Sequence, residues 1–247
     1  MQSPKNSCLR LFPLVMLFFS SVASALAASA FTADDSLAAA IEAARKTHDE
    51  SQLQSVKVQL DKKIAQNPNK AGAYYDQARV HAYFADVYEM RKDKKAAVEA
   101  IDKGIEAVQH SLQIDDKSAD AHSLLADLYG RKISLGNGMF AGPKFGPKVK
   151  EENAKAMALD DKNPCVWASL GRQYLMAPKM FGGDVAKAIG SFQKSLAVDP
   201  NQDETWVWLA KAFQKQGDKT KARDAIQHAL SLDPDSPWIR KAANSLN

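Results

Sequence analysis

The sequence predicts an all-α fold built from stacked pairs of antiparallel helices. Apolar residues recur at helical spacing through most of residues 32–247, and a pattern of large and small side chains repeats in the last third of the chain. No segment shows the strict alternation of a half-buried strand. Hydrophobic residues make up 45% of the 247 residues, which is ample for one continuous core. We therefore expect helix pairs that share a core along the stack.

The clearest repeat runs from Asp203 to Ser236. Large residues such as Trp206 and Phe213 mark its first helix, and the small Ala222 marks the second. Two helices can cross closely only where small side chains meet large ones. Gly217 suits the turn between the helices, and a proline, Pro234, follows the second helix and prevents its continuation.

This unit resembles a tetratricopeptide (TPR) repeat, and the preceding unit repeats its signature at Trp167, Leu170, Gly171 and Tyr174. The resemblance covers most of residues 32–247 and implies a right-handed α-solenoid of about five hairpins with a C-terminal capping helix. The expected parts are a signal peptide over 1–27 and a repeat domain over 28–247, with units at 32–69, 70–117, 118–162, 163–201 and 202–235 and a cap at 236–247.

Two units are longer than the last one. Tyr174 and Ala188 are 14 residues apart, whereas the equivalent Phe213 and Ala222 are 9 apart. The extra residues are expected to form loops at 134–148 and 176–183, which share Met, Phe, Gly and a Pro-Lys pair and would leave the same edge of the stack. They could form a binding lip or a plug over the helix ends. The residues of interest are Phe140, Lys144, Phe145, Lys179 and Phe181.

The TPR resemblance implies a concave groove lined by the first helix of each pair. Polar and aromatic residues beside the packing positions can face such a groove without disturbing the core. The candidate binding residues are Tyr75, Arg79, Arg172, Gln173, Trp208 and Lys211.

The N-terminus has the order of a secretory signal peptide. Lys5 and Arg10 precede an apolar run over 11–19, and small residues follow over 20–30. We expect cleavage after Ala27 and a periplasmic or secreted mature protein. The apolar run is shorter than the roughly 20 residues that a bilayer span needs, so stable membrane insertion after cleavage is not expected.

Charge does not indicate nucleic acid as a partner. The chain has 33 basic and 29 acidic residues, a net charge of +4, and removal of Lys5 and Arg10 with the signal peptide lowers it to +2. Acidic and basic residues are interspersed along the predicted helices, as on solvated helix faces. We therefore expect no nucleic-acid binding.

The sequence indicates no catalytic, cofactor or metal site. Residues 136–141 satisfy G-x-G-x-x-A, but a predicted helix precedes them and Pro143 and Pro147 follow, whereas a dinucleotide site needs a strand and then a helix. The five histidines show no metal-ligand spacing, although ligands assembled from several helices remain open. No serine lies in a G-x-S-x-G motif.

The predicted function is therefore a non-enzymatic scaffold that holds a protein or peptide in its concave groove, with no cofactor. The alternative is a periplasmic TPR subunit that binds a small solute or accompanies a transporter. An open groove would favour the first function, and an enclosed, partly apolar pocket would favour the second.

Overall fold

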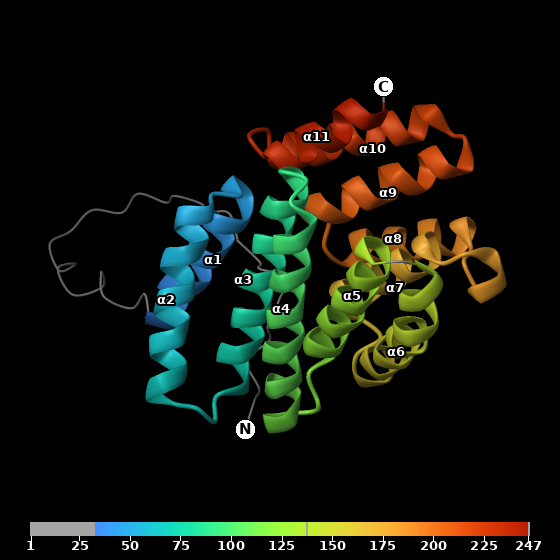
Figure 1. The fold of residues 1–247 in the computed structure, drawn as a ribbon. Coiled ribbons are helices and arrows are strands. Elements are labelled where there is room, and N and C mark those ends of the chain that lie inside the picture. Colours follow the sequence, from blue (N-terminus) through green and yellow to red (C-terminus); the bar gives the residue numbers. More distant parts are fainter. Residues whose placement is uncertain (1–32, 137, 247) are drawn as a thin grey trace, which may run out of the picture.

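The computed structural model describes residues 33–136 and 138–246, and this part of the chain contains eleven α-helices, one 3-10 helix and no strand (Figure 1). The predicted signal peptide, 1–27, lies outside the described residues. The helices are α1 (Ala33–Thr47), α2 (Glu50–Gln66), α3 (Ala71–Met90), α4 (Lys94–Ile114), α5 (Ala119–Leu135), α6 (Gly138–Leu159), α7 (Pro164–Met176), η1 (Lys179–Phe181), α8 (Val185–Val198), α9 (Asp203–Gln216), α10 (Lys219–Leu232) and α11 (Pro237–Leu246).

Consecutive helices pack as hairpins, and the hairpins stack in chain order (Figure 1). The odd-numbered helices α1, α3, α5, α7 and α9 also contact one another along the stack, and we call them the inner helices. The even-numbered helices α2 to α10 are the outer helices. The last helix, α11, packs on α9 and α10 as a cap. The predicted fold, five hairpins and a capping helix in a TPR-like solenoid, is confirmed.

A hydrogen bond recurs at the same position in several repeats. Near the start of several helices, a side-chain nitrogen lies within hydrogen-bond distance of the backbone carbonyl six residues upstream, in the linker between hairpins. The pairs are His122 Nε2 with Asp116 O at 3.0 Å, Trp167 Nε1 with Asp161 O at 2.7 Å, Trp206 Nε1 with Pro200 O at 2.9 Å and Arg240 Nε with Pro234 O at 2.9 Å.

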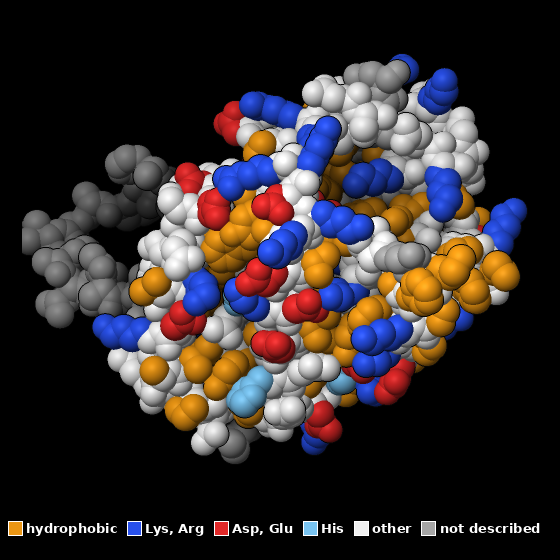
Figure 2. All heavy atoms as spheres, viewed as in Figure 1, with side chains coloured by type: hydrophobic (Ala, Val, Ile, Leu, Met, Phe, Trp, Pro, Cys, Tyr) orange, Lys and Arg blue, Asp and Glu red, His pale blue; other side chains and the backbone are white. Residues whose placement is uncertain are grey.

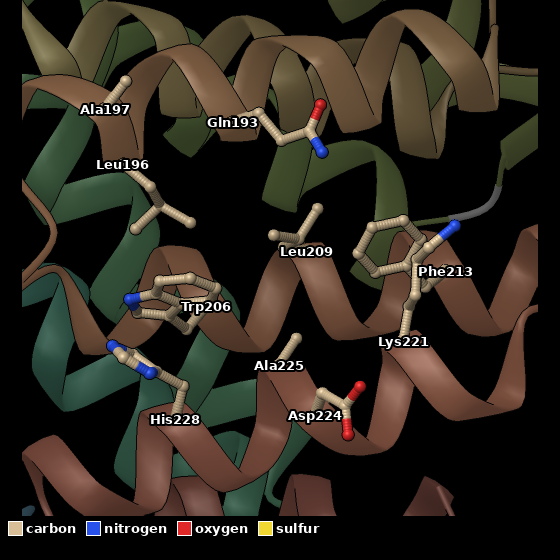
Figure 3. A pocket seen from close by; sticks show the side chains of 10 residues that line it. All are labelled: Gln193, Leu196, Ala197, Trp206, Leu209, Phe213, Lys221, Asp224, Ala225 and His228. Atoms are coloured by element: carbon tan, nitrogen blue, oxygen red, sulfur yellow. The ribbon is translucent and has the colours of Figure 1, made fainter.

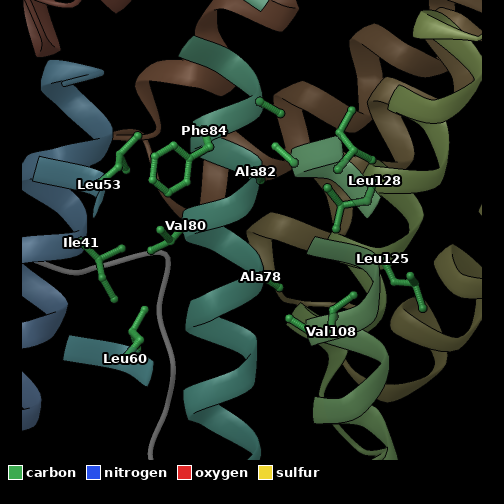
Figure 4. Close-up of a cluster of buried hydrophobic side chains, with 14 of the residues drawn as sticks. Ile41, Leu53, Leu60, Ala78, Val80, Ala82, Phe84, Val108, Leu125 and Leu128 are labelled. Atoms are coloured by element: carbon green, nitrogen blue, oxygen red, sulfur yellow. The ribbon is translucent and has the colours of Figure 1, made fainter. Parts of the chain in front are cut away.

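The core forms two large clusters that meet at α5–α7. Buried side chains of the first cluster come from α1 to α6 (Figure 4), and those of the second come from α7 to α11. A small cluster of Ala119, Ala156 and Val166 lies between them. Hydrogen bonds supplement packing at this junction: Ser169 Oγ donates to Asp127 Oδ1 at 2.9 Å.

The predicted loop at 134–148 is wrong for most of its length, because α6 begins at Gly138 and is continuous through it. Ala141, Phe145 and Val149 are spaced four residues apart and form a buried or partly buried stripe on one side of α6. The ring of Phe145 stacks on Tyr129 of α5, with 5.7 Å between ring centroids. The extra residues therefore lengthen the helix pair.

The prolines inside α6 explain the wrong prediction. Pro143 and Pro147 each remove one backbone hydrogen bond, and both side chains are exposed. The stripe that packs on α5 stabilises the helix despite this loss. In the second insert, 176–183, the structure does contain a short connection, with the single turn η1 and Gly182 at φ 92°.

Candidate functional site

Four inner helices carry a charged side chain at the same repeat position. Five residues beyond His122, Trp167 and Trp206 come Asp127, Arg172 and Lys211. The Tyr74 ring lies at a tilt against His110, as the Trp206 ring does against His228, and five residues beyond Tyr74 comes Arg79. This inner row consists of Arg79, Asp127, Arg172 and Lys211.

Arg79 lies between two tyrosine rings. Its guanidinium carbon is 5.9 Å from the ring centroids of both Tyr75 and Tyr83, and Nη2 donates to the Tyr83 hydroxyl at 3.3 Å. Nη1 also donates to Asp76 at 3.3 Å. Burial raises the pKa of the Tyr75 phenol, which therefore stays neutral. The predicted residues Tyr75 and Arg79 thus form one cluster on α3.

Lys211 forms a similar cluster on α9. Its ammonium lies 4.2 Å from the ring centroid of Trp208 and 5.1 Å from that of Trp238 on α11. Burial lowers the pKa of Lys211, while Asp86 and Glu89 act in the opposite direction. Lys211 forms no salt bridge with another described residue. The structure thus brings the predicted Trp208 and Lys211 together and adds Trp238.

The predicted residues on α7 are already engaged within the protein. Arg172 forms a bidentate ion pair with Asp127 of α5, in which Nε donates to Oδ1 at 2.9 Å and Nη2 donates to Oδ2. Gln173 accepts a hydrogen bond from Asn153 of α6 at 2.8 Å. Both contacts join helices, so these side chains tie the stack together beside the inner face.

Sequence reasoning missed Asp86, Glu89 and Arg131, which form an ion-pair cluster between α3 and α5. The Arg131 guanidinium lies 2.9 Å from Asp86 Oδ1 and also bonds Glu89 and the carbonyl of Ala82. Burial raises the pKa of Asp86 to about 7, against the opposing effect of Arg131. Burial thus disfavours the ionised form of Asp86, and the ion pair with Arg131 favours it.

Glu204, in the first turn of α9, was also missed. Its carboxylate accepts a hydrogen bond from Arg45 of α1 at 3.1 Å. Its charge also raises the pKa of Arg131 and Arg172 and opposes the lowering of the Lys211 pKa, so it acts on groups from α5, α7 and α9. A comparison of repeat positions finds the inner row. It could not have found Glu204, because the contact of Glu204 with Arg45 exists only when the stack curves.

The residues predicted for the two inserts have different surroundings. Phe145 is partly buried against the core, whereas Phe140 and Phe181 are 72% and 55% exposed. Lys144 and Lys179 are exposed. None of the cation–aromatic clusters of the inner face includes these side chains.

A groove on the outer side lies between α8, α9 and α10 (Figure 3). It has a volume of about 510 Å³ and is open to solvent. Trp206, Leu209 and Phe213 of α9 line it, and Lys221, Asp224 and His228 of α10 face them (Figure 3). In the described ranges 33–136 and 138–246, no three His, Cys, Asp or Glu side chains are grouped as metal ligands would be.

The sequence of the chain matches the family model described as regulator of microtubule dynamics protein 1-3 over residues 40–246. The chain belongs to this family. The match runs from the second half of α1 to the capping helix, so both the inner row and the two lengthened units lie within the family region. No curated relative matches this family member by sequence.

Solved structures similar to this chain include two that are described as TPR proteins. A thermophilic TPR protein from Thermus thermophilus, TTC0263, has a TM-score of 0.61 at 14% identity and covers 85% of this chain and 98% of its own. MamA gives a TM-score of 0.41 at 15% identity, covering 75% and 91%. YrrB, described as a TPR protein with an unusual peptide-binding site, gives 0.39 at 16% identity, covering 83% and 90%. The TPR fold rests on the first of these.

Proposed function

We propose that the protein is a non-enzymatic scaffold whose inner face binds a protein or peptide segment. The observation that carries the proposal is the Lys211 cluster, in which a partly buried ammonium lies over Trp208 and Trp238. Aromatic rings and cations of this kind are enriched where binding energy concentrates in interfaces. A peptide carbonyl or carboxylate can accept a hydrogen bond from Lys211 while an apolar side chain covers the indole.

The rest of the inner row supports this use of the face. Asp127 and Arg172 neutralise each other, so the cation–aromatic clusters around Arg79 and Lys211 stand on either side of a neutral pair. Glu204 and Asp86 supply acceptors for the backbone or for basic groups of the same ligand. An extended segment that runs across α3, α5, α7 and α9 would meet all of these groups in turn.

The test is selection of peptides from a random displayed library on the full chain, followed by affinity measurement with the Trp208→Ala variant. We expect selected peptides to bind this variant at least about tenfold more weakly, which corresponds to roughly 1.4 kcal/mol. The matched control is Trp167→Ala, which removes a tryptophan that contacts Lys194 of an outer helix. This control should retain the affinity.

Equal affinity of the selected peptides for the wild type and for Trp208→Ala would contradict the proposal. Loss of affinity with Trp167→Ala alone would place peptide binding on the outer side. Calorimetric binding of a small solute, abolished by Trp208→Ala in the absence of peptide binding, would instead favour a solute-binding protein. We propose, from the N-terminal sequence, that the protein is exported to the periplasm or secreted.

A further inference from the structure

Exposed apolar side chains gather at a second surface, away from the inner face. Of the nine large hydrophobic side chains that are exposed among the described residues, four are scattered along the chain. The other five belong to the start of α6 and to the connection between α7 and α8. We call these five the apolar lip: Met139 (77% exposed), Phe140 (72%), Met176 (54%), Met180 (83%) and Phe181 (55%).

The two parts of the apolar lip lie on the same side of the molecule. Lys150 of α6 reaches the α7–α8 connection, where its Nζ lies 3.9 Å from the position of a Cβ built on Gly182. The Asn153–Gln173 hydrogen bond ties α6 to α7. Figure 2 shows hydrophobic side chains together on the side of the molecule where Figure 1 places η1 and the start of α6.

Four lysines lie in the two segments that carry the apolar lip. Residues 136–150 and 173–183 contain Lys144, Lys148, Lys150 and Lys179 and no Asp or Glu. All four lysines are exposed. Acidic residues follow directly after both segments, at Glu151 and Asp184, so the excess of positive charge is confined to the segments that carry the exposed apolar surface.

The packing of α6 holds this surface in place. Phe140, Lys144 and Lys148 are spaced four residues apart and form an exposed stripe. The neighbouring stripe, at 141, 145 and 149, packs on α5. Phe140 therefore projects outward from a helix that is anchored in the core, and its exposure is a property of the packed fold.

We propose that the apolar lip docks the protein on a membrane surface that carries anionic lipids. Phenylalanine and methionine side chains that project from helix ends can enter the boundary between headgroups and acyl chains, while lysines beside them contact anionic headgroups. Three of these side chains, Met139, Phe140 and Met180, are at least 72% exposed, and exposed apolar side chains beside lysines suit a lipid surface. No described helix has the length and hydropathy to cross a bilayer, so the contact is peripheral.

The experiment is co-sedimentation of the full chain with vesicles of phosphatidylcholine that contain about 30% phosphatidylglycerol, compared with vesicles of phosphatidylcholine alone. We expect stronger partitioning into the anionic vesicles and a decrease when the salt concentration rises from about 0.1 to 0.5 M. The double variant Phe140→Ser with Phe181→Ser should partition at least about tenfold less, and so should the triple variant Lys144→Glu, Lys148→Glu and Lys179→Glu.

The matched control is Val58→Ser, which removes another exposed apolar side chain, 57% exposed, from α2. It should partition as the wild type does. All chains carry the same N-terminal segment, so a difference in partitioning between them results from the substituted side chains. Circular dichroism and the thermal midpoint should be unchanged in every variant, because the substituted side chains are exposed.

Equal partitioning of the wild type and the double variant would overturn the proposal, as would equal binding to neutral and anionic vesicles. Binding of an acidic amphipathic peptide to this surface, without vesicle binding, would assign it to a protein partner and would also overturn it. Because peptide selection on the inner face does not use these residues, either proposal can fail while the other stands.

Discussion

Gly171 shows how one residue controls the distance between two helices. A Cβ at this position of α7 would lie 2.6 Å from the ring of Phe192 on α8, and that ring is fully buried. The glycine therefore lets a large aromatic side chain fill the space between the helices. The neighbouring Arg172 then reaches Asp127 on the inner face.

We predict that Gly171→Ala lowers the free energy of unfolding by about 1–3 kcal/mol, because the new methyl group displaces Phe192 from a filled core. Urea unfolding followed by circular dichroism would measure it. Gly190→Ala in α8 is the matched control, since a Cβ at that position would have no heavy atom of another helix within 4 Å. The higher helix propensity of alanine should therefore stabilise the protein by roughly 0.5–1 kcal/mol. Similar effects of the two substitutions would contradict the packing argument.

Among the elements, α6 differs most from its expected form. Its first half contains two prolines and several glycines, yet it is helical because one side of it packs on α5. Tertiary contacts thus override a poor local propensity. The same helix separates two roles, since Phe145 faces the core and Phe140 faces solvent.

Removal of the Phe145 ring should therefore disturb the first half of α6. We predict that Phe145→Ala lowers the free energy of unfolding by about 2 kcal/mol, because the partly buried ring loses its contact with Tyr129. Hydrogen exchange over the start of α6 should also become faster. In Phe140→Ala the change should stay within about 0.5 kcal/mol. If Phe140→Ala lost as much stability as Phe145→Ala, the assignment of Phe145 to the core side of α6 and of Phe140 to its solvent side would be wrong.

At the scale of the whole molecule, the curvature of the stack brings its two ends into contact. Arg45 of α1 bonds Asp203 Oδ2 at 2.9 Å and Glu204 Oε1 at 3.1 Å, although the partners are 158 and 159 residues apart. Lys241 of α11 also donates to the carbonyl of Met90 at 3.4 Å. In an extended solenoid each unit contacts only its neighbours. Here these hydrogen bonds also join the first two hairpins directly to the last hairpin and the capping helix.

We predict that Arg45→Ala accelerates hydrogen exchange in α9 as well as in α1 and lowers stability by roughly 1–3 kcal/mol, because Asp203 is buried and loses its cationic partner. The control is Lys103→Ala, which removes an exposed ion pair with Glu99 and should change stability by less than about 1 kcal/mol. If faster exchange is confined to α1, the contact between the two ends does not stabilise the inner face.

The sequence alone determined the all-α class, the hairpin repeat and the cap. These features depend on local periodicity and on Gly and Pro positions, as at Gly217 and Pro234, and such signals lie within one or two helices. Aromatic and charged residues beside the packing positions were also recognisable, which is why Trp208 and Lys211 were selected as candidates.

Only the tertiary structure decided how those residues combine. The contact of Glu204 with Arg45, the addition of Trp238 to the Lys211 cluster and the helical form of α6 all depend on the angle at which hairpins stack. That angle results from packing summed over the whole chain, and no single segment encodes it. Residues far apart in the sequence therefore acquire their neighbours, and their chemistry, only in the folded molecule.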